Sequence, residues 1–381
     1  MAASRRADTT MAQREAPARA AWNFAAGPAR LPDAVLARAG AALFERGADG
    51  AAAIERPFTG AGFREVLADA RQRLAALLSV PDHYRVLFLA GGAMHQFSMV
   101  PMNLLDPASG LRRVAYADSG YWSRRAMQEA ARYAEVAVVA RHAGEPPLTA
   151  PPLDDWQVPP DCAYCHITAN ETVDGIAYPA WPGTGAVPLV ADATSCFLSA
   201  PLDVSKFGLI YASAQKNIGP SGMTVVIVRE DLLQRPALAA PSALCYRLQA
   251  AQDSCLNTPP TLAIHLAALV FDWISESGGL VAMASANRRK SELLYGAIDN
   301  SQGFYTAPVA RGHRSTTNVR FHLADEHLTE VFLTDAAAAG LHHLRGHRQI
   351  GGLRASLYNA MPDAGVAALV DFMAEFAQGH G

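Results

Sequence analysis

Apolar residues recur along this chain with two alternating periods, one typical of helices and the other of strands. Between residues 61 and 79 they follow one another at steps of three and four, which predicts a helix with one buried face. Residues 85–90 (RVLFLA) form a short unbroken apolar run, as expected for a strand that is buried on both sides. Gly91 and Gly92 follow this run, and a second helical pattern then continues to Leu105.

Short apolar runs continue this alternation through the middle of the chain. They predict strands at residues 114–117, 134–140, 162–167, 188–191, 209–212 and 224–228. Because helical segments separate these strands, the pattern favours an α/β fold with a largely parallel sheet. We interpret residues 22–272 as one large domain, in which helices flank this sheet.

The pattern changes from about Trp273 onward. A long helical pattern at 278–297 precedes one alternating strand at 317–322, and a last helical pattern covers 364–377. We interpret residues 273–381 as a smaller α+β domain, and we expect the N-terminal segment of the large domain to pack against it. The length of 381 residues agrees with two domains, because it exceeds one compact core of ordinary size.

Composition narrows the possible partners and the location. The formal net charge is −3, which gives no reason to expect nucleic acid or a membrane surface as a partner. No segment is apolar enough to span a bilayer, so we expect a cytoplasmic protein. Residues 1–21 are rich in Ala and Arg and lack the apolar run of a secretory signal. We expect a disordered extension there, or a start site assigned upstream of Met11.

The five cysteines do not indicate disulfide or metal chemistry. Cys162 and Cys165 form the only C-x-x-C motif, and no second pair of Cys or His stands at zinc-site spacing. We interpret both as buried strand residues, and we expect no metal site.

The sequence contains only three lysines, which narrows the candidates for lysine chemistry. Lys290 lies in the charged stretch NRRKSELL, which is typical of a solvated helix face, and Lys206 precedes a strand as surface lysines often do. Lys216 comes soon after the apolar run LIYA and before a Gly-Pro turn. Ligands of open α/β sheets gather at the carboxyl ends of strands, so Lys216 is the lysine best placed to bind a cofactor.

Three further features follow predicted strands, and each also has a simpler explanation. Asp192 ends the run VPLVAD and suits a pyridinium partner, although it also suits a helix N-cap. The turn at 91–94 suits a phosphate at a helix N-terminus, and equally a plain tight turn. Trp122 could stack on a planar cofactor or fill a core. Their order with Lys216, each after its own strand, favours a pyridoxal-phosphate site.

Longer stretches carry a more specific signal than these single residues. They are NFAAGPARLP at 23–32, NETVDGI at 170–176, YASAQKNIGPSGMTVVIVREDLL at 211–233, NTPPT at 257–261 and GHRQIGGLRASLYNAMP at 346–362. From about Trp22 to the C-terminus the chain resembles the phosphoserine aminotransferases, which are class V, fold-type I enzymes that depend on pyridoxal 5'-phosphate. The resemblance implies this fold and cofactor, and a homodimer with active sites at the subunit interface.

The resemblance also implies a role for individual residues. Lys216 would carry the cofactor, Asp192 would pair with its ring nitrogen, and Trp122 would stack on its ring. Arg354 would pair with the α-carboxylate of an amino-acid or oxo-acid substrate, which suits a bidentate guanidinium. The remaining implied contacts are Thr172 with the ring oxygen, Gln215, Ala93 and Met94 with the phosphate, Asn257 and Thr258 with the same phosphate from the other subunit, and His347 and Arg348 with the distal anion of the substrate.

Two departures from the family pattern concern the binding of anions. Where the family usually has a His-Arg pair, an alignment on Gly60 places Phe58 and Thr59. The phosphate turn, usually Gly-Gly-Gly-Arg-Gly-Gln-Phe, reads Gly-Gly-Ala-Met-His-Gln-Phe at 91–97, so that Met94 replaces an arginine. A charged hydrogen bond contributes about 1.5–3 kcal/mol, so the loss of two or three would weaken anion binding strongly.

These departures lead us to favour an aminotransferase that uses glutamate or a similar donor and a substrate altered from 3-phosphohydroxypyruvate. The distal group of that substrate would be less charged or bulkier and would face Phe58, Thr59 and Met94. The alternative is a phosphoserine aminotransferase of serine biosynthesis, which forms O-phosphoserine and 2-oxoglutarate. In that case Arg56 or His95 would replace the lost cations.

Two other classes of function are less favoured by the sequence. Elimination or desulfuration on the same cofactor is one of them, and a desulfurase would need a cysteine on a mobile loop. Cys245 and Cys255 are the only loop candidates. The other is a protein that binds the cofactor without turnover, for which the chain offers no helix-turn-helix region or additional domain.

Overall fold

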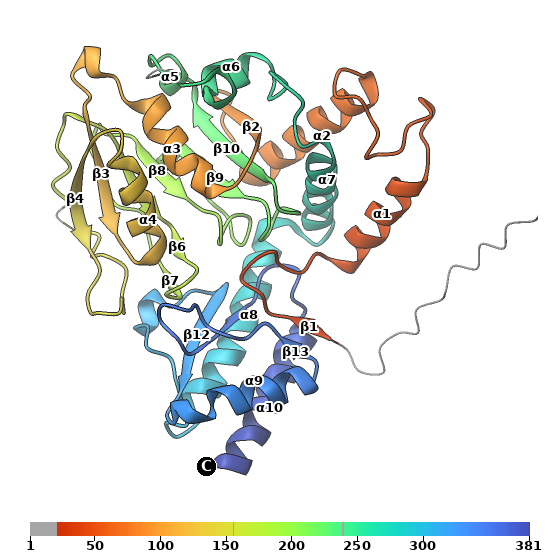
Figure 1. The fold of residues 1–381 in the computed structure, drawn as a ribbon, viewed down its shortest axis with the longest axis vertical. Helices are drawn as coiled ribbons and strands as arrows, with labels where there is room; N and C mark the ends of the chain where they lie inside the picture. The colour runs from red at the N-terminus through yellow and green to blue at the C-terminus, as the bar shows by residue number, and fades with distance from the viewer. Residues whose placement is uncertain (1–20, 155, 238–239) are drawn as a thin grey trace, which may run out of the picture.

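A computed structural model describes residues 21–154, 156–237 and 240–381. The extension expected to be disordered at residues 1–21 therefore lies outside the described residues, apart from Ala21. In the described part of the chain, a seven-stranded sheet forms the centre of the larger lobe in the upper half of Figure 1. Its strands stand in the order β2 (Tyr84–Ala90), β10 (Met223–Arg229), β9 (Leu209–Ser213), β8 (Leu189–Asp192), β5 (Cys162–Thr168), β3 (Arg113–Asp118) and β4 (Glu135–Arg141).

The sheet is mostly parallel, which confirms the predicted fold class. The strands β9, β8, β5, β3 and β4 pair in parallel, whereas β10 runs antiparallel to both of its neighbours. Because β2 is antiparallel to β10, it points the same way as β9. The carboxyl ends of β2, β3, β5, β8 and β9 consequently meet at one edge of the sheet.

Helices cover both faces of this sheet. Alternate residues of a strand enter different cores, because side chains of a strand point to opposite faces. Val86 and Phe88 of β2 pack in one core, and Leu87 and Leu89 pack in the other. The first core also receives residues of α1 (Asp33–Phe44), α2 (Ala61–Leu78) and α7 (Thr261–Glu276), and the second receives residues of α3 (Ala93–Leu104), α4 (Tyr121–Ala130), α5 (Glu230–Leu233) and α6 (Tyr246–Ala251).

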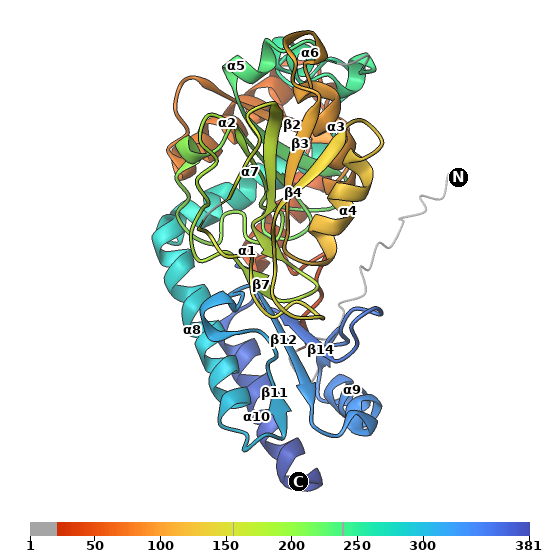
Figure 2. The same cartoon turned by 90° about the vertical axis from the view of Figure 1, so that its left-hand side faces the viewer.

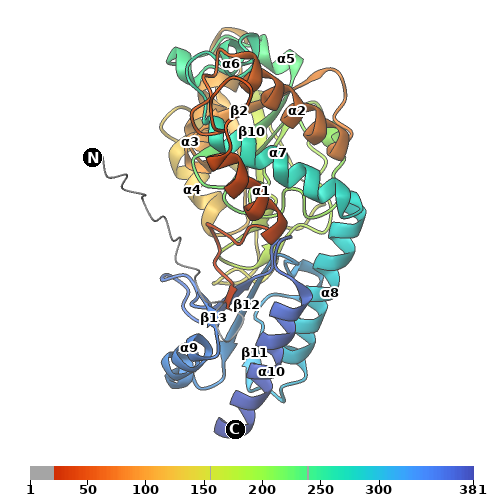
Figure 3. The ribbon, with the colours of Figure 1, turned by 90° about the vertical axis from the view of Figure 1, so that its right-hand side faces the viewer.

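The smaller lobe follows α7 along the chain and has a core of its own. Helix α8 (Gly279–Asp299) leads into it, and Figure 3 shows α10 (Asp363–His380) lying alongside α8. A three-stranded sheet of β11 (Tyr305–Thr306), β12 (Asn318–Leu323) and β14 (Leu353–Ser356) completes the lobe together with α9 (Thr329–Ala338), as Figure 2 shows.

The two ends of the chain meet in this lobe. Strand β1 (Trp22–Asn23) pairs in parallel with β13 (Leu341–His342). Beyond β1, the amide of Ala29 donates a hydrogen bond to the carbonyl of Gln215 at 2.8 Å. The N-terminal segment therefore crosses from the small lobe to the loop that contains Lys216.

The predicted placement of Lys290 on a solvated helix face is wrong. Its side chain is buried, with an exposed fraction of 2%. The ammonium donates hydrogen bonds to the carbonyls of Leu357, Tyr358 and Met361 at 2.9–3.0 Å. The side chain faces the loop that follows β14. The burial is possible because three carbonyls of that loop accept all three ammonium hydrogens.

Within the described residues, no single helix is long and apolar enough to cross a membrane. Helices α7 and α8 meet the length and composition criteria only when taken together, and they are inclined to each other by 82°.

Candidate active site

A cavity of about 320 Å³ lies at the edge where the parallel strands end. Several of the predicted residues line it, among them Lys216, Asp192 and Trp122. The complete lining consists of Gly92, Ala93, Met94, His95, Trp122, Thr168, Asn170, Thr172, Asp192, Thr194, Ser195, Gln215 and Lys216. The cavity thus unites loops that follow β2, β3, β5, β8 and β9.

Lys216 enters this cavity from the loop that follows β9. Its Nζ donates to the hydroxyl oxygen of Thr172 at 2.5 Å, and the residue is buried, with an exposed fraction of 8%. Burial lowers the pKa of Lys216 to about 8, and the charge of Arg354 acts in the same direction, whereas Asp192 opposes both. An amine with such a pKa is partly neutral near neutral pH and can therefore act as a base.

Asp192 is the last residue of β8, as the sequence predicted. Its Oδ1 accepts a hydrogen bond from the amide of Thr194 at 2.9 Å. Burial raises the pKa of Asp192, while bonds from Thr194, the charge of Lys216 and the hydroxyl of Tyr211 lower it. Residues 194–198 form turns rather than a helix, so this hydrogen bond closes a turn and Asp192 is not an N-cap. The second carboxylate oxygen can accept from a cationic partner in the cavity.

The turn between β2 and α3 has the features of an anion cradle. The first N–H groups of a helix have no partner inside it, and Ala93 and Met94, the first two residues of α3, line this cavity. Gly91 has a φ of +106°, and a Cβ there would lie 2.6 Å from Nδ1 of His95. That nitrogen accepts the amide of Gly92 at 3.1 Å. Gln215, bonded through its Oε1 to the hydroxyl of Ser213 at 2.5 Å, closes the other side.

Two carboxylates that the sequence analysis did not single out fix the position of Trp122. The oxygens of Glu171 accept the amides of Trp122 and Ser123 at 2.8 and 2.9 Å, and Asp174 accepts the amide of Tyr121 at 2.9 Å. Burial raises the pKa of Glu171 to about 8, and the charge of Asp174 adds to this effect. The signal was the acidic spacing within NETVDGI, but only the fold shows that these acids cap α4 from another segment.

The small lobe contributes Arg354 from β14. Its Nη1 donates to the carbonyl of Thr172 at 3.3 Å, so the guanidinium lies beside the residue that contacts Lys216. Arg320 stands directly opposite Arg354 in the register of β12 and β14. The exposed fraction of Arg320 is 3%, and its Nε and Nη1 have no hydrogen-bond partner among the described residues. A buried and a half-buried guanidinium therefore lie side by side on these two strands, and the charge of Asp174 acts on both.

His347 and Arg348 lie on the loop that precedes β14. The ring of His347 is 4.7 Å from the ring of Tyr121, next to Trp122 on α4. Burial lowers the pKa of His347, and the charges of Arg354 and Arg348 lower it further. Arg348 itself is exposed. His347 therefore lies near the cavity, and Arg348 is directed at least partly to solvent.

Seven of the predicted residues do not line the cavity around Lys216: His347, Arg348 and Arg354, described above, and Asn257, Thr258, Phe58 and Thr59. Asn257 and Thr258 line a separate cavity of about 240 Å³, which His95 also borders. Phe58 packs against the core that contains α2, and Thr59 is exposed. The resemblance assigned Asn257 and Thr258 to the other subunit, so their distance from Lys216 within one chain agrees with that assignment.

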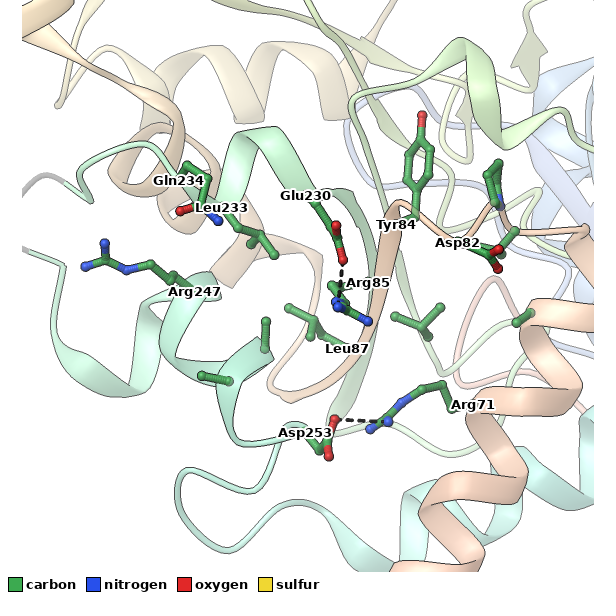
Figure 4. A pocket seen from close by; sticks show the side chains of 16 residues that line it. Arg71, Asp82, Tyr84, Arg85, Leu87, Glu230, Leu233, Gln234, Arg247 and Asp253 are labelled. Atoms are coloured by element: carbon green, nitrogen blue, oxygen red, sulfur yellow. Dashed lines mark ion pairs between the residues drawn. The ribbon is translucent and has the colours of Figure 1, made fainter.

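A larger hollow of about 680 Å³ lies away from Lys216, at the amino end of β2 (Figure 4). Four of its charged side chains form two ion pairs. Arg71 pairs with Asp253 at 3.0 Å, and Arg85 pairs with Glu230 at 2.7 Å, as the dashed lines of Figure 4 mark. No described lysine lines this hollow. We therefore assign the chemistry to the cavity around Lys216.

The cysteines have no role in that cavity's lining. Cys162 and Cys165 are buried in β5, which confirms the strand interpretation. The loop candidates Cys245 and Cys255 are buried as well. A desulfurase would need a cysteine on a mobile loop, and no cysteine among the described residues is exposed.

The residues of the Lys216 cavity fit pyridoxal phosphate. They provide a buried amine, a carboxylate for a ring nitrogen and a helix N-terminus for a phosphate. Trp122 Nε1 and Thr168 Oγ1 are buried and have no hydrogen-bond partner among the described residues. Buried polar atoms seldom stay unpaired, so these two indicate that the cavity receives a polar ligand.

Comparison with known proteins agrees with this chemistry. A family model described as aminotransferase class-V matches residues 21–369. A phosphoserine aminotransferase from Acidithiobacillus ferrooxidans is 49% identical over 364 residues, which cover 94% of this chain and 99% of the relative. One from Azotobacter vinelandii is 49% identical over 361 residues, with coverages of 95% and 99%.

Solved structures lead to the same group of proteins. The phosphoserine aminotransferase from Bacillus circulans subsp. alkalophilus is 43% identical and superposes with a TM-score of 0.92, covering 95% of this chain and 99% of that chain. A pyridoxal-phosphate-bound phosphoserine aminotransferase from Trichomonas vaginalis is 38% identical with a TM-score of 0.88, and the coverages are 93% and 100%.

Proposed function

The chain belongs to the phosphoserine aminotransferase family of class-V aminotransferases and is a pyridoxal-phosphate-dependent aminotransferase, and we propose that it transfers the amino group of glutamate to 3-phosphohydroxypyruvate. The observation that carries this proposal is an identity of 49% over 94% of the chain with a relative named phosphoserine aminotransferase. The site supports it, because Lys216 and Asp192 line one cavity and Arg354 bonds to Thr172, which lines the same cavity.

The proposed chemistry divides among these three residues. When bound, pyridoxal phosphate supplies an aldehyde that condenses with amines and a pyridinium ring that withdraws electrons. Asp192 holds the proton of the ring nitrogen through its buried carboxylate. The amine of Lys216 removes the proton from the α-carbon of the amino acid, because its lowered pKa leaves it partly neutral.

Cationic side chains would orient the substrate. Arg354 presents its guanidinium beside Thr172 and would bind the α-carboxylate in a bidentate manner. His347, near Tyr121, and the exposed Arg348 would bind the distal phosphate or carboxylate. Both substrates carry two anionic ends, so the proposed reaction needs a second anion-binding group besides Arg354.

We further propose that the active enzyme is a homodimer. Asn257, Thr258 and Thr59 do not line the Lys216 cavity of their own chain, and in the proposed dimer they would reach the cavity of the second copy. Large apolar side chains near α1 support this proposal, since the exposed fractions of Phe44 and Ile54 are 83% and 56%. Exposed apolar groups of this size mark surfaces that other proteins cover.

A substrate altered from 3-phosphohydroxypyruvate is the second candidate, and it rests on Met94. This apolar side chain borders the cavity with an exposed fraction of 53%, at the place where the family pattern has an arginine. Phe58 and Thr59 likewise replace a His-Arg pair. Identity to the named relatives weighs more heavily, because it extends over the whole described chain.

A half-reaction with the purified, cofactor-loaded protein distinguishes the two candidates. Glutamate, O-phosphoserine and a panel of other amino acids are each added, and the absorption of the bound cofactor is followed. Rapid conversion by both glutamate and O-phosphoserine at micromolar concentration supports the proposed reaction. Conversion by glutamate without conversion by O-phosphoserine contradicts it and favours the altered substrate. No conversion by any amino acid contradicts both.

A further inference from the structure

A row of buried polar side chains lies behind Asp192 on the face of the sheet that α3 and α4 cover. Tyr211 of β9 stands beside Asp192 in the strand register, and His166 of β5 lies on the opposite side of β8. The Nε2 of His166 and the hydroxyl of Tyr211 are 2.8 Å apart. None of the functions assigned above uses His166 or Tyr211, and neither borders the Lys216 cavity.

Both side chains are uncharged. Burial lowers the pKa of His166 to about 3, and burial raises the pKa of Tyr211 far above its ordinary value. His166 therefore carries one proton, either on Nδ1 or on Nε2. Its Nδ1 has no partner among the described residues, and its ring stacks on Tyr116 with the centroids 4.7 Å apart.

The carboxylate of Asp192 fixes the direction of the hydrogen bonds. When ionised it can only accept, so the hydroxyl of Tyr211, its neighbour in the register of β8 and β9, would be the donor in a hydrogen bond between the two side chains. The oxygen of Tyr211 then accepts from His166, which requires the proton of His166 on Nε2. This leaves Nδ1 as an unpaired acceptor and avoids an unpaired buried N–H group.

We propose that Tyr211 and His166 are positioning residues that keep Asp192 ionised, through a directed chain from Nε2 of His166 to the hydroxyl of Tyr211 and on to the carboxylate. The proposal rests on the proposed role of Asp192 as the partner of the ring nitrogen, and it is independent of the amino acceptor. An ionised carboxylate at Asp192 favours a protonated ring nitrogen, and the protonated ring is the form that withdraws electrons.

Other ionisable groups surround the hydrogen-bonded chain of His166, Tyr211 and Asp192, and their pKa values set the pH range of a test. Lys216 lies on the cavity side of Asp192, and Cys196 lies near the same carboxylate. The groups packed around Tyr211 and His166 are Tyr116, Tyr164 and Tyr246. Burial raises the pKa of Cys196 to about 12 and raises the pKa of each of these tyrosines above its ordinary value, so they remain neutral between pH 6 and about 9.

Nitrogen NMR of histidine-labelled holoenzyme tests the direction of the chain without an activity measurement. The signals of His166 are assigned by their absence in His166→Asn. We expect a protonated Nε2 and an unprotonated Nδ1 at every pH from 6 to about 9, because burial keeps the pKa of His166 far below this range. The opposite tautomer, or a doubly protonated ring, would overturn the proposal.

Tyr211→Phe and Tyr164→Phe form a matched pair for the effect on Asp192. Both remove a buried hydroxyl on the same sheet, but the hydroxyl of Tyr164 bonds to Tyr116 at 3.0 Å and not to the chain. The ring of Tyr211 also packs edge-on against Phe97, a contact that phenylalanine retains. The two variants should therefore have similar thermal stability.

We expect Tyr211→Phe to slow the half-reaction with glutamate by about ten- to a hundredfold, with little change in the glutamate concentration that gives half-maximal rate. The absorption of its bound cofactor should also change with pH in a range where that of Tyr164→Phe is constant. Equal rates and spectra for the two variants would overturn the proposal. If the wild type converts with no amino acid, the proposed function fails, whereas the NMR result still decides this inference.

Discussion

The amine of Lys216 donates a hydrogen bond to the hydroxyl of Thr172, and the guanidinium of Arg354 donates to the carbonyl of the same residue. One residue of the turn after β6 (Asn170–Glu171) therefore contacts the amine from the large lobe and a cation from the small lobe. The distance between the amine of Lys216 and the guanidinium of Arg354 depends on the position of this turn, and Glu171 and Asp174 anchor the turn to α4.

Replacement of the amine should abolish the reaction. We expect Lys216→Ala to slow the half-reaction with glutamate by at least about 10³-fold, because both the covalent anchor and the base are lost. The matched control is Lys206→Ala, which removes an exposed lysine outside the cavity and should leave the rate unchanged. Stopped-flow absorption of the bound cofactor measures both rates. A Lys216→Ala variant that reacts within tenfold of the wild type would show that another group is the base.

The guanidinium shape of Arg354 should matter beyond its charge. Arg354→Lys keeps the charge but loses bidentate pairing, so we expect the KM for glutamate to rise about ten- to a hundredfold, with a smaller effect on kcat. Arg345→Lys serves as the control, because Arg345 forms an exposed ion pair with Glu330 on the surface. Steady-state kinetics decide this prediction. A kcat effect without a KM effect would argue against carboxylate binding by Arg354.

The buried ammonium of Lys290 should make stability depend on pH. Burial lowers its pKa from an ordinary 10.5 to about 8, so the unfolded chain binds more protons between these values, and stability rises with pH through that window. Lys290→Met removes this contribution. We expect the free energy of unfolding of the wild type, relative to Lys290→Met, to increase by about 2 kcal/mol between pH 7.5 and 9.5.

Urea unfolding at the two pH values measures this difference. Lys216, whose pKa is lowered similarly, is present in both proteins and cancels. A pH-independent difference between wild type and Lys290→Met would mean that Lys290 keeps its ordinary pKa in the folded protein.

A new cation at Thr59 should strengthen the binding of phosphorylated substrates. In the proposed dimer Thr59 faces the cavity of the other subunit, so Thr59→Arg restores a charged donor to the distal anion. We expect the dissociation constant of O-phosphoserine to fall about tenfold, and that of alanine to stay constant. Thr59→Gln controls for size. Titration of the cofactor absorption with each amino acid gives both constants, and equal tightening for both ligands would contradict the proposed location of Thr59.

Local periodicity was sufficient to place many of the secondary elements. The apolar spacing at 61–79 predicted α2, which ends at Leu78, because a helix must bury one stripe of side chains. The run at 85–90 predicted β2, but not that this strand would pair antiparallel with β10. Pairing direction depends on how the chain returns to the sheet, and residue periodicity contains no information on this.

The candidate site was predictable to the extent that strand ends determine it. Asp192 and Lys216 follow β8 and β9, and the parallel sheet brings their side chains to one cavity. The role of Lys290 was predicted wrongly because its neighbours in sequence are charged, whereas its partners are carbonyls about seventy residues later. The capping acids Glu171 and Asp174 were missed for the same reason, since the helix that they cap belongs to another segment.

The parallel pairing of Trp22 with Leu341 has a consequence for the order in which the molecule assembles. During translation the first strand leaves the ribosome long before β13 exists, so it must wait for nearly the whole chain. Closing a loop of that length costs conformational entropy. The contacts of the small lobe offset this cost only once that lobe has formed. The segment through Ala29, which bonds to Gln215 beside Lys216, can therefore reach its final position only after β13 has been synthesised.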